Sequence, residues 1–551
     1  MAEAVAHQDV AAPAREALAA RAFTPVVATC TAAVATFLAL RLTAWPPHED
    51  ETLALFVGRN SLGGMLSTVL NQRGGAPLHF VFAWFVAHTG GGLTALRLVS
   101  ACFAVASVPL IAVLCSRLAG RSPAMVATVL ASASWMLLFH GVYGRMYSLF
   151  LFTSLLSYLA LLQATETGGR GRWAAWIAAT LLCVAAHPYG ALVLASQAVY
   201  VAAARLRLRA AAVSFGVVTV LGIPFWRTDL VLAGRFEVGV GGGGDRLGNP
   251  LDVLRYLERT LGDFAAGYRA VVALVFALGV LGAYRLVKTR PRSALLVGAV
   301  VLTPAAFLML ARFGSAAAPE SRHLIFVMPF TFAVIGTGLV DAARVLGRYS
   351  IAAGVLALCA IVALEVSWGW QRTADLYRGE PAGRVAARDA ASLWLAATSR
   401  PDDVLFGYDP LFLQAWGRGG KLSRSVVPRA DARLALRALR AAHMPLGRGV
   451  WVFDASDTGN PARRLAVPNR SPQPREAFET RAFGPFLVVR TVEPTGDVRS
   501  YLRLARRAEL TGKALAISAA DTNLLTVLGA SGRLAAYERG RGADSSSTAS
   551  R

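Results

Sequence analysis

Four titratable side chains follow one another near the start of the chain, at His48, Glu49, Asp50 and Glu51. Carboxylates grouped in this way can act as a general base, and together with the imidazole they can bind a divalent metal ion. Acidic residues are also favoured in the first turn of a helix, where they interact with its dipole. Asp50 and Glu51 are the first candidates for a catalytic base. His48, Glu49 and Glu51 are candidate metal ligands, and a divalent metal ion is the one cofactor that the sequence leaves open.

Side chains that suit a phosphate group occur at several other places along the chain. Guanidinium and imidazole groups donate charge-assisted hydrogen bonds to phosphate oxygens. Each position alone has a simpler explanation, such as an arginine that reaches from a helix end to water. The candidates for phosphate binding are Arg145, His187, Arg322 and His323, and the supporting candidates are His48, Glu49, Arg59, His79, Tyr147 and Tyr189.

The composition indicates what kind of chain must position these residues. Of 551 residues, 55% are hydrophobic and 16% are charged, with a formal net charge of +23. Soluble domains contain about 25% charged residues, so an ordinary soluble enzyme is excluded, and the apolar content excludes a disordered chain. Nucleic-acid binders concentrate their basic residues on a soluble face, whereas here the apolar residues form long blocks.

These blocks are long enough to cross a membrane. A bilayer needs roughly 20 predominantly apolar residues per helix. The pair His187-Pro188 divides what would otherwise be one long block. The sequence therefore predicts an α-helical polytopic membrane protein with about eleven spans, near 23–43, 94–116, 123–141, 146–165, 173–187, 189–204, 210–226, 268–284, 294–311, 323–343 and 350–370.

The positive-inside rule orients these spans. If the N-terminal segment 1–22 is cytoplasmic, every short inside loop is basic, as in Arg117 with Arg121 and Arg344 with Arg348. We therefore predict a multi-pass plasma-membrane protein whose C-terminal part is extracytoplasmic. The candidate residues then fall on the outer ends of spans or on outside loops, which places them on one membrane face.

Two loops and a C-terminal region lie outside in this topology. The loops are 44–93, which contains short amphipathic stretches, and 227–267. Residues 371–540 alternate short apolar strands with amphipathic helices, a pattern typical of a small α/β domain. The segment 541–551 is rich in serine and is predicted to be disordered.

Other site types lack support in the sequence. All five cysteines fall inside predicted spans, so a disulfide framework is not expected. The glycine run at 239–244 has no following Lys-Ser/Thr and no preceding strand, so it predicts a flexible external segment rather than a nucleotide-binding loop. Nucleic acid is not expected as a partner, because the basic residues are not interleaved with aromatic ones.

The ordered set of motifs along residues 23–370 resembles the GT-C glycosyltransferases. The nearest branch is the bacterial proteins similar to protein O-mannosyltransferases and lipid A aminoarabinose transferase, in glycosyltransferase family 39. Two motifs differ from the usual family pattern: Ala76-Pro77-Leu78-His79-Phe80 replaces Pro-Pro-Leu-Tyr-Tyr, and Arg145-Met146-Tyr147 replaces Arg-Pro-Tyr. The motifs that carry the resemblance are Asp50-Glu51-Thr52, Pro77-Leu78-His79-Phe80, Leu96-Arg97-Leu98-Val99-Ser100, Gly144-Arg145-Met146-Tyr147-Ser148, His187-Pro188-Tyr189-Gly190 and Arg322-His323-Leu324.

The resemblance implies an enzyme of the cell envelope that uses a polyprenyl-phosphate sugar as donor. Asp50 would deprotonate the hydroxyl of an extracytoplasmic glycan, lipid or protein acceptor, and the anomeric carbon would be inverted. Glu51, or Glu49 with His48, would orient Asp50 or bind a metal ion. Arg145, His187 and Arg322 would neutralise the departing phosphate.

Two other functions compete with this interpretation. A transporter or flippase of lipid-linked sugars is expected to show inverted repeats and charge near the bilayer midplane, and neither is visible in the sequence. A non-catalytic envelope scaffold would not need acids and cations on one membrane face. The sequence specifies neither the sugar nor the acceptor.

Overall fold

A computed structural model describes residues 2–515 except 237–248, 266–271, 312–319, 346–349, 456–465 and several positions within 422–444. The chain forms two compact units. The first comprises residues 1–46, 61–231 and 243–379, and the second comprises 47–60, 232–242 and 380–551. The glycine run 239–244, the tail 541–551 and most of residues 431–442 lie outside the described residues.

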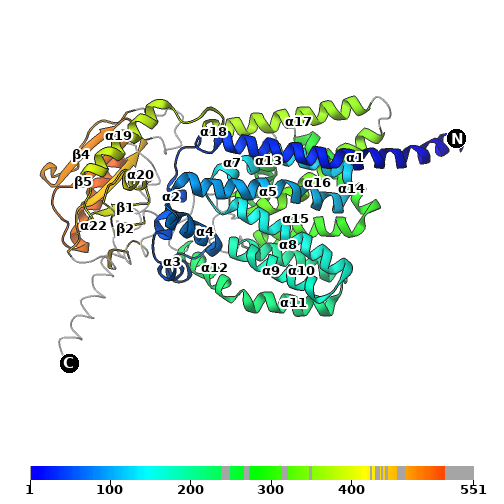
Figure 1. The fold of residues 1–551 in the computed structure, drawn as a ribbon, viewed down its shortest axis with the longest axis horizontal. Helices are drawn as coiled ribbons and strands as arrows, with labels where there is room; N and C mark the ends of the chain where they lie inside the picture. The colour runs from blue at the N-terminus through cyan, green and yellow to red at the C-terminus, as the bar shows by residue number, and fades with distance from the viewer. Residues whose placement is uncertain are drawn as a thin grey trace. The chain divides into compact units, whose positions relative to one another are not determined.

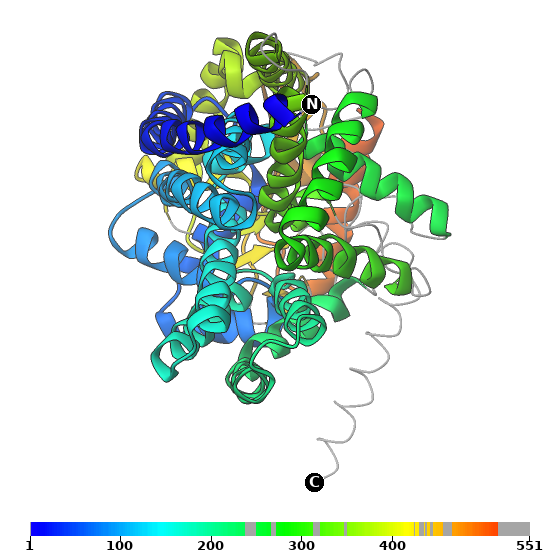
Figure 2. The same ribbon diagram turned by 90° about the vertical axis from the view of Figure 1, so that its right-hand side faces the viewer.

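The first unit is built from helices that pack side by side (Figures 1 and 2). Helix α5 packs against α1, α6 and α8, and α8 packs against α9. Glycines with positive φ end several of them, such as Gly120 after α5 and Gly168 after α8. The helices are α1 (Ala2–Arg41), α3 (Leu62–Thr68), η1 (Val69–Arg73), α4 (Pro77–His88), α5 (Leu93–Ala119), α6 (Arg121–Ala133), α7 (Trp135–Val142), α8 (Tyr147–Thr167), α9 (Arg170–Ala186), α10 (Gly190–Ala203), α11 (Leu208–Leu221), α12 (Ile223–Phe236), α13 (Pro250–Phe264), α14 (Val272–Thr289), α15 (Pro291–Ala311), η2 (Ser321–Val327), α16 (Met328–Val345), α17 (Ser350–Arg372) and α18 (Ala374–Arg378).

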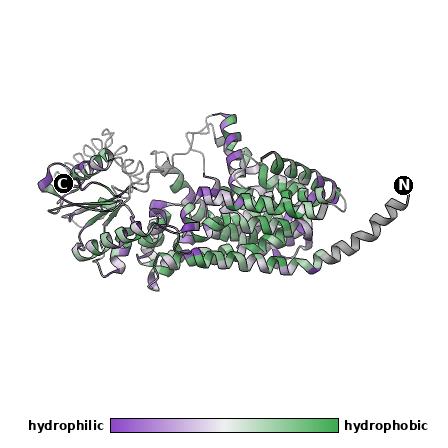
Figure 3. Ribbon diagram, turned by 90° about the horizontal axis from the view of Figure 1, so that it is seen from above, coloured by the Kyte–Doolittle hydropathy of each residue, from purple (hydrophilic) through white to green (hydrophobic). Residues whose placement is uncertain are grey.

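Six helical segments among the described residues are long and apolar enough to span a membrane, or up to eight if each of two bent pairs is one span. Figure 3 shows that apolar residues dominate the helices of this unit. The six segments are Ala19–Arg41, Leu93–Ala119, Tyr147–Thr167, Pro291–Leu310, Ser321–Val345 and Ala352–Arg372.

The multi-pass helical architecture is therefore confirmed, with six to eight candidate spans among the described residues where the sequence predicts about eleven. The predicted span 123–141 is the pair α6 and α7, bent by 49°, and the span at 210–226 is the pair α11 and α12, bent by 59°. The break predicted at His187 is present, but the helices on either side, α9 and α10, have only 17 and 14 residues. Hydropathy counts apolar residues and does not detect where a helix bends or stops short.

Helices α14 and α16 approach closely because both carry glycine at their crossing. A Cβ atom placed on Gly282 would clash with the backbone of Val334, and one on Gly338 would clash with the backbone of Leu278. Small residues of this kind let the backbones of membrane helices pack against each other.

The second unit contains a five-stranded mixed sheet of order β2-β1-β3-β5-β4. Strand β1 is parallel to β2 and β3, while β5 is antiparallel to β3 and β4. The elements of this unit are α2 (Glu49–Gly58), α19 (Ala382–Thr398), β1 (Val404–Phe406), α20 (Pro410–Gly417), β2 (Ser425–Val427), β3 (Gly449–Asp454), η5 (Arg475–Ala477), β4 (Phe478–Phe483), β5 (Phe486–Thr491) and α22 (Val498–Ala514).

Large buried side chains form the core on one side of this sheet. Trp451 of β3 stacks on Tyr501 of α22 with ring centroids 5.6 Å apart, and Phe453 and Val489 are buried in the same cluster. A buried pair of Arg448 and Asp403 lies at the start of β1, with its N–O distances at 2.9 Å. The C-terminal part is therefore an α/β structure, as predicted.

Candidate active site

The acidic segment forms the start of helix α2, and most of its polar groups bind the backbone there. The N–H of His48 donates to Glu51 Oε2 and the N–H of Asp50 donates to His48 Nδ1, both at 3.1 Å. This reciprocal arrangement is a capping box, which satisfies N–H groups that a helix start leaves without partners. Glu51 is fully buried, whereas Asp50 is half-buried.

The same helix is bonded to residue 408 in the second unit. The N–H of Tyr408 donates to Glu49 Oε1 at 3.2 Å, and the Thr52 hydroxyl donates to the carbonyl of Tyr408. His48, Glu49 and Glu51 thus accept backbone hydrogen bonds, while Asp50 contributes its own N–H to the cap.

A metal site formed by His48, Glu49 and Glu51 does not fit this geometry. A ligand atom on each of these side chains already accepts a backbone N–H. Within the described part of the chain, no group of three or more His, Cys, Asp or Glu side chains could hold a metal ion.

A second cluster, in the first unit, surrounds Tyr147 at the beginning of α8. The Tyr147 ring lies 5.7 Å from His187 and 5.8 Å from His323, measured between centroids. The Arg322 guanidinium carbon lies 5.1 Å from the same ring, and Tyr189 stacks on His323 at 5.3 Å. Five of the predicted residues, far apart in sequence, are therefore brought together. We refer to them and to His140, described below, as the histidine cluster.

The junction between α9 and α10 positions His187 and Tyr189. Helix α9 ends at Ala186, and His187 turns out of it in an extended conformation. The N–H of Tyr189 donates to His187 Nδ1 at 3.0 Å. Gly190, the first residue of α10, lies very close to the backbone of α9. A Cβ at this position would lie 2.7 Å from Val184 Cα. The buried His187 ring is thereby held with its Nε2 as the remaining donor.

The same kind of hydrogen bond, from a backbone N–H to a histidine Nδ1, occurs in residues 320–323 at the start of η2. The N–H of Glu320 donates to His323 Nδ1 at 3.0 Å. The Glu320 carboxylate pairs with Arg322 at 2.7 Å. Since Nδ1 accepts, the neutral imidazole of His323 also carries its proton on Nε2.

Arg145 and His79 interact electrostatically within the first unit. The loop carbonyl of Arg145 accepts from the Ser100 hydroxyl at 3.2 Å, and the charge of Arg145 acts on both His187 and His79. Burial, and to a lesser degree Arg145, lowers the pKa of His79 to about 3. His79 is therefore neutral at physiological pH and can only be a neutral hydrogen-bonding group.

His140 was not predicted as a site residue from the sequence. This residue of α7 is 1% exposed, its ring lies 4.7 Å from Tyr147, and neither of its ring nitrogens has a hydrogen-bond partner. The available signal was an ionisable residue within an apolar helix, Trp135–Val142, because such residues are rare inside membranes and often functional.

Two other motif residues have mainly structural contacts. Arg97 is buried and donates to the carbonyls of Leu42, Trp45 and Pro46, at 3.3, 2.7 and 3.1 Å, so it fixes the chain after α1. Arg59 lies 5.0 Å from the Trp416 ring in the second unit, so it does not belong to the histidine cluster.

Comparisons with known proteins bear on the fold. No protein-family model and no curated protein matches the chain. The apo crystal structure of ArnT from Cupriavidus metallidurans matches with a TM-score of 0.57 and 15% identity, over 86% of this chain and 98% of that one. The structure of the same protein bound to undecaprenyl phosphate matches with a TM-score of 0.53 and 15% identity, over 85% and 98%.

A third match is the oligosaccharyltransferase of Archaeoglobus fulgidus in complex with Zn and sulfate, with a TM-score of 0.47 and 14% identity, over 79% of this chain and 68% of that one. The matches to ArnT extend over nearly all of that protein and include the membrane helices. The chain is thus a multi-pass membrane protein with the GT-C fold.

Proposed function

We propose that this protein is a membrane glycosyltransferase that transfers a sugar from a polyprenyl-phosphate donor to an acceptor outside the cytoplasm. The observation that carries the proposal is the histidine cluster with Arg322, because it gathers a guanidinium and several N–H donors beside membrane helices. Such a site suits an anionic headgroup whose lipid tail stays in the bilayer. A GT-C neighbour of known structure binds undecaprenyl phosphate, which supports this choice of donor.

Asp50 is the proposed base of the reaction. Its carboxylate takes the proton of the acceptor hydroxyl as that oxygen attacks the anomeric carbon. The bond between this carbon and the phosphate oxygen breaks, and the polyprenyl phosphate leaves with the electron pair. Attack from the side opposite the leaving group inverts the anomeric carbon. Glu51 and His48 orient Asp50 by capping the helix that carries it.

Arg145 and Arg322 would stabilise the charge that develops on the leaving phosphate. The Nε2–H groups of His187 and His323 would donate hydrogen bonds to its oxygens, and Tyr147 and Tyr189 would keep the imidazoles in place. No step is assigned to a metal ion, because the described residues include no group of three or more His, Cys, Asp or Glu side chains that could hold one.

The test is turnover by the purified, lipid-embedded protein with a panel of polyprenyl-phosphate sugars, with and without EDTA. We expect sugar transfer or slow donor hydrolysis with at least one donor. Asp50→Asn should lower kcat by about 10²–10⁴-fold, the usual contribution of a general base. The matched control is Asp252→Asn, which removes a half-buried carboxylate paired with Arg255 and should leave kcat unchanged.

Two results would contradict the proposal. A folded protein that turns over none of the donors would favour a transporter or scaffold, and vesicle assays with a labelled lipid-linked sugar would separate these two. Full activity of Asp50→Asn would exclude Asp50 as the base.

A further inference from the structure

The segment that carries Asp50 folds with the C-terminal part of the chain. Residues 47–60 belong to the second unit, although more than 300 residues separate them from its main body. Residues on both sides of Asp50 bond to one position, Tyr408: its N–H binds the Glu49 carboxylate and its carbonyl accepts from the Thr52 hydroxyl. The backbone N–H and carbonyl of Tyr408 therefore both form hydrogen bonds to the first turn of α2.

Tyr408 itself is held firmly by the sheet. It follows strand β1, which pairs on both sides with parallel strands. The N–H of Gly407 donates to the carbonyl of Val427 at 2.7 Å, and Gly407 has a φ of 87°, a conformation that favours glycine. Asp409 caps the next helix by accepting the N–H of Leu411 at 2.8 Å. The position that holds α2 is thus fixed by its own neighbours.

The apolar face of α2 adds a second attachment one turn later. The Phe56 ring contacts Trp416 edge-on at 4.6 Å and Tyr408 at 5.8 Å. At the end of the helix, the Arg59 guanidinium carbon lies 5.0 Å from the Trp416 ring. Residues 51–58 are all buried, so α2 cannot rotate without losing these contacts.

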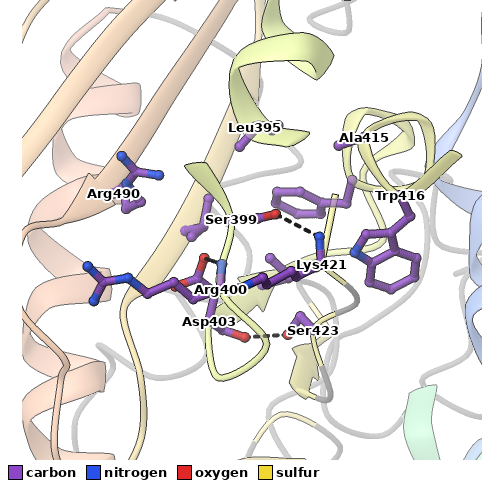
Figure 4. Close-up of a pocket in the computed structure, with 12 residues that line it drawn as sticks. Leu395, Ser399, Arg400, Asp403, Ala415, Trp416, Lys421, Ser423 and Arg490 are labelled. Atoms are coloured by element: carbon purple, nitrogen blue, oxygen red, sulfur yellow. Dashed lines mark hydrogen bonds between the residues drawn. The ribbon is translucent and has the colours of Figure 1, made fainter. Parts of the chain in front are cut away.

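A pocket beside Trp416 is too small to bind a sugar. Figure 4 shows Trp416 at the edge of this pocket, with Lys421 and Ser399 nearby. The space open to a water-sized sphere is about 20 Å³, and one water needs roughly 10–15 Å³. Its buried acid, Asp403, is already paired with Arg448. A sugar does not fit there, which leaves the contacts of Trp416 with α2 as its evident role.

We infer that Thr52, Phe56 and Trp416 are positioning residues that, with the backbone of Tyr408, set the direction in which Asp50 meets the acceptor. This inference rests on the proposed function. It gives the part of the second unit that begins at residue 380 a role in catalysis that does not require this part to bind substrate. A displacement of about 1 Å in a reacting group can lower a rate by 10²-fold, so small changes in this attachment are expected to act on kcat.

The test compares side-chain changes at the attachment with matched changes elsewhere in the same unit. Thr52→Val removes the hydroxyl that donates to Tyr408, and Trp416→Leu removes the ring that holds Phe56. We expect kcat to fall at least 10-fold for each, with the donor KM changed less than twofold. Thr52→Ser, which keeps the hydroxyl, should restore most of the rate.

The control variants remove the same kinds of group from other contacts. Thr511 of α22 makes an i−4 hydroxyl bond within its helix, so Thr511→Val is matched to Thr52→Val. Trp394 lies between Arg481 and Arg490, so Trp394→Leu is matched to Trp416→Leu. Both controls should keep the wild-type kcat. Thermal unfolding of every variant shows whether a loss of rate merely follows a loss of folded protein.

A further comparison isolates the role of Asp50. If Thr52 acts through Asp50, Thr52→Val should not lower the residual rate of the Asp50→Asn variant. Wild-type kcat in both Thr52→Val and Trp416→Leu, with Asp50→Asn inactive, would overturn the inference and leave the proposed function intact. Equal losses in the attachment and control variants would also overturn it. Full activity of Asp50→Asn would instead overturn the proposed base.

Discussion

The rings of His187 and His323 are oriented by the same kind of hydrogen bond. In each, Nδ1 accepts a nearby backbone N–H at 3.0 Å, so a neutral ring keeps its proton on Nε2. The rings lie 5.4 Å apart between centroids. Two fixed donors beside one another can bind oxygens of the same phosphate without first losing rotamer freedom, which lowers the entropic cost of binding.

We expect that Arg322 acts mainly by increasing the affinity for the donor. Hydrogen bonds to charged groups are worth about 1.5–3 kcal/mol, which corresponds to roughly 10–150-fold in affinity. Arg322→Met should therefore raise the donor KM by at least 10-fold, and Arg322→Lys should raise it less. Arg117→Met removes an exposed arginine that pairs with Glu166 at 3.8 Å and is the control. An unchanged KM in Arg322→Met would remove Arg322 from the donor site.

Replacement of His140 should separate stability from function. A buried polar group without a partner costs about 1–3 kcal/mol, and His140 has none for either ring nitrogen among the described residues. His140→Phe should therefore raise Tm or leave it unchanged, while the donor KM increases several-fold. A fall in Tm together with an unchanged KM would indicate that His140 only packs. Thermal unfolding and donor titration on the same sample measure both.

Asp263 provides a pH-dependent test of the start of η2. Its carboxylate accepts from Ser321 and lies 3.6 Å from Arg372. Burial raises its pKa above the ordinary value of 3.8, although these two partners act in the opposite direction. A carboxyl whose pKa is raised in the folded state stabilises the fold at low pH, and this contribution is lost as the pH rises through the raised pKa. The Tm of Asp263→Asn minus that of wild type should therefore increase between pH 4 and pH 8, and Asp252→Asn, at a carboxylate paired with Arg255, is the matched control. A constant difference would contradict the raised pKa.

At the scale of elements, the turn between α9 and α10 depends on a glycine. Gly190→Ala would place a Cβ 2.7 Å from Val184 Cα and 2.9 Å from the carbonyl oxygen of Cys183, which forces the two helices apart. We expect a loss of stability of about 1–3 kcal/mol, typical of overpacking, and weaker donor binding because His187 moves. Gly171→Ala, where nothing lies within 4 Å of the new Cβ, should be neutral or slightly stabilising. Similar unfolding temperatures for both variants would argue against the close approach.

The elements were predictable where a local signal exists. The break at His187-Pro188 is visible in the sequence because proline cannot continue a helix, and the apolar runs at β1, β3 and β5 mark their strands. The bend between α6 and α7 lies in a continuous apolar block, so hydropathy does not reveal it. Strands β2 and β4 were not predicted, because β2 has three residues and β4 is partly exposed at the edge of the sheet.

At the scale of the whole molecule, the site residues were easier to predict than their contacts. Residue type and position at the ends of apolar blocks identified Tyr147, His187 and His323, which the structure brings together. Tyr408 contributes its backbone N–H and carbonyl to the attachment of α2, and a residue that binds through its backbone leaves no signal in the sequence. The resemblance to GT-C enzymes supplied the roles of these residues, and these roles stay predictions.

The orientation of the chain can be tested directly. The basic inside loops predict a cytoplasmic N-terminus and an extracytoplasmic C-terminal unit. Alkaline phosphatase fused after residue 551 should be active in bacterial cells, and the same enzyme fused after residue 168, between α8 and α9, should be inactive. A fluorescent protein that matures only in the cytoplasm should show the opposite pattern. Reversal of both patterns would invert the topology and remove the candidate residues from the outer face.

Membership of residues 47–60 in the second unit also sets an order of events during synthesis. The main body of that unit starts at residue 380, so α2 leaves the ribosome more than 300 residues before Tyr408 and Trp416 exist. At roughly 5–20 residues per second, the acidic segment waits on the order of 15–60 s for its partners. A nascent or truncated chain can insert its membrane helices during this interval, but its base is not yet held in place. Under the proposed function, a chain that stops before residue 408 is therefore expected to transfer sugar more slowly than the full chain, because Asp50 is not yet held by Tyr408.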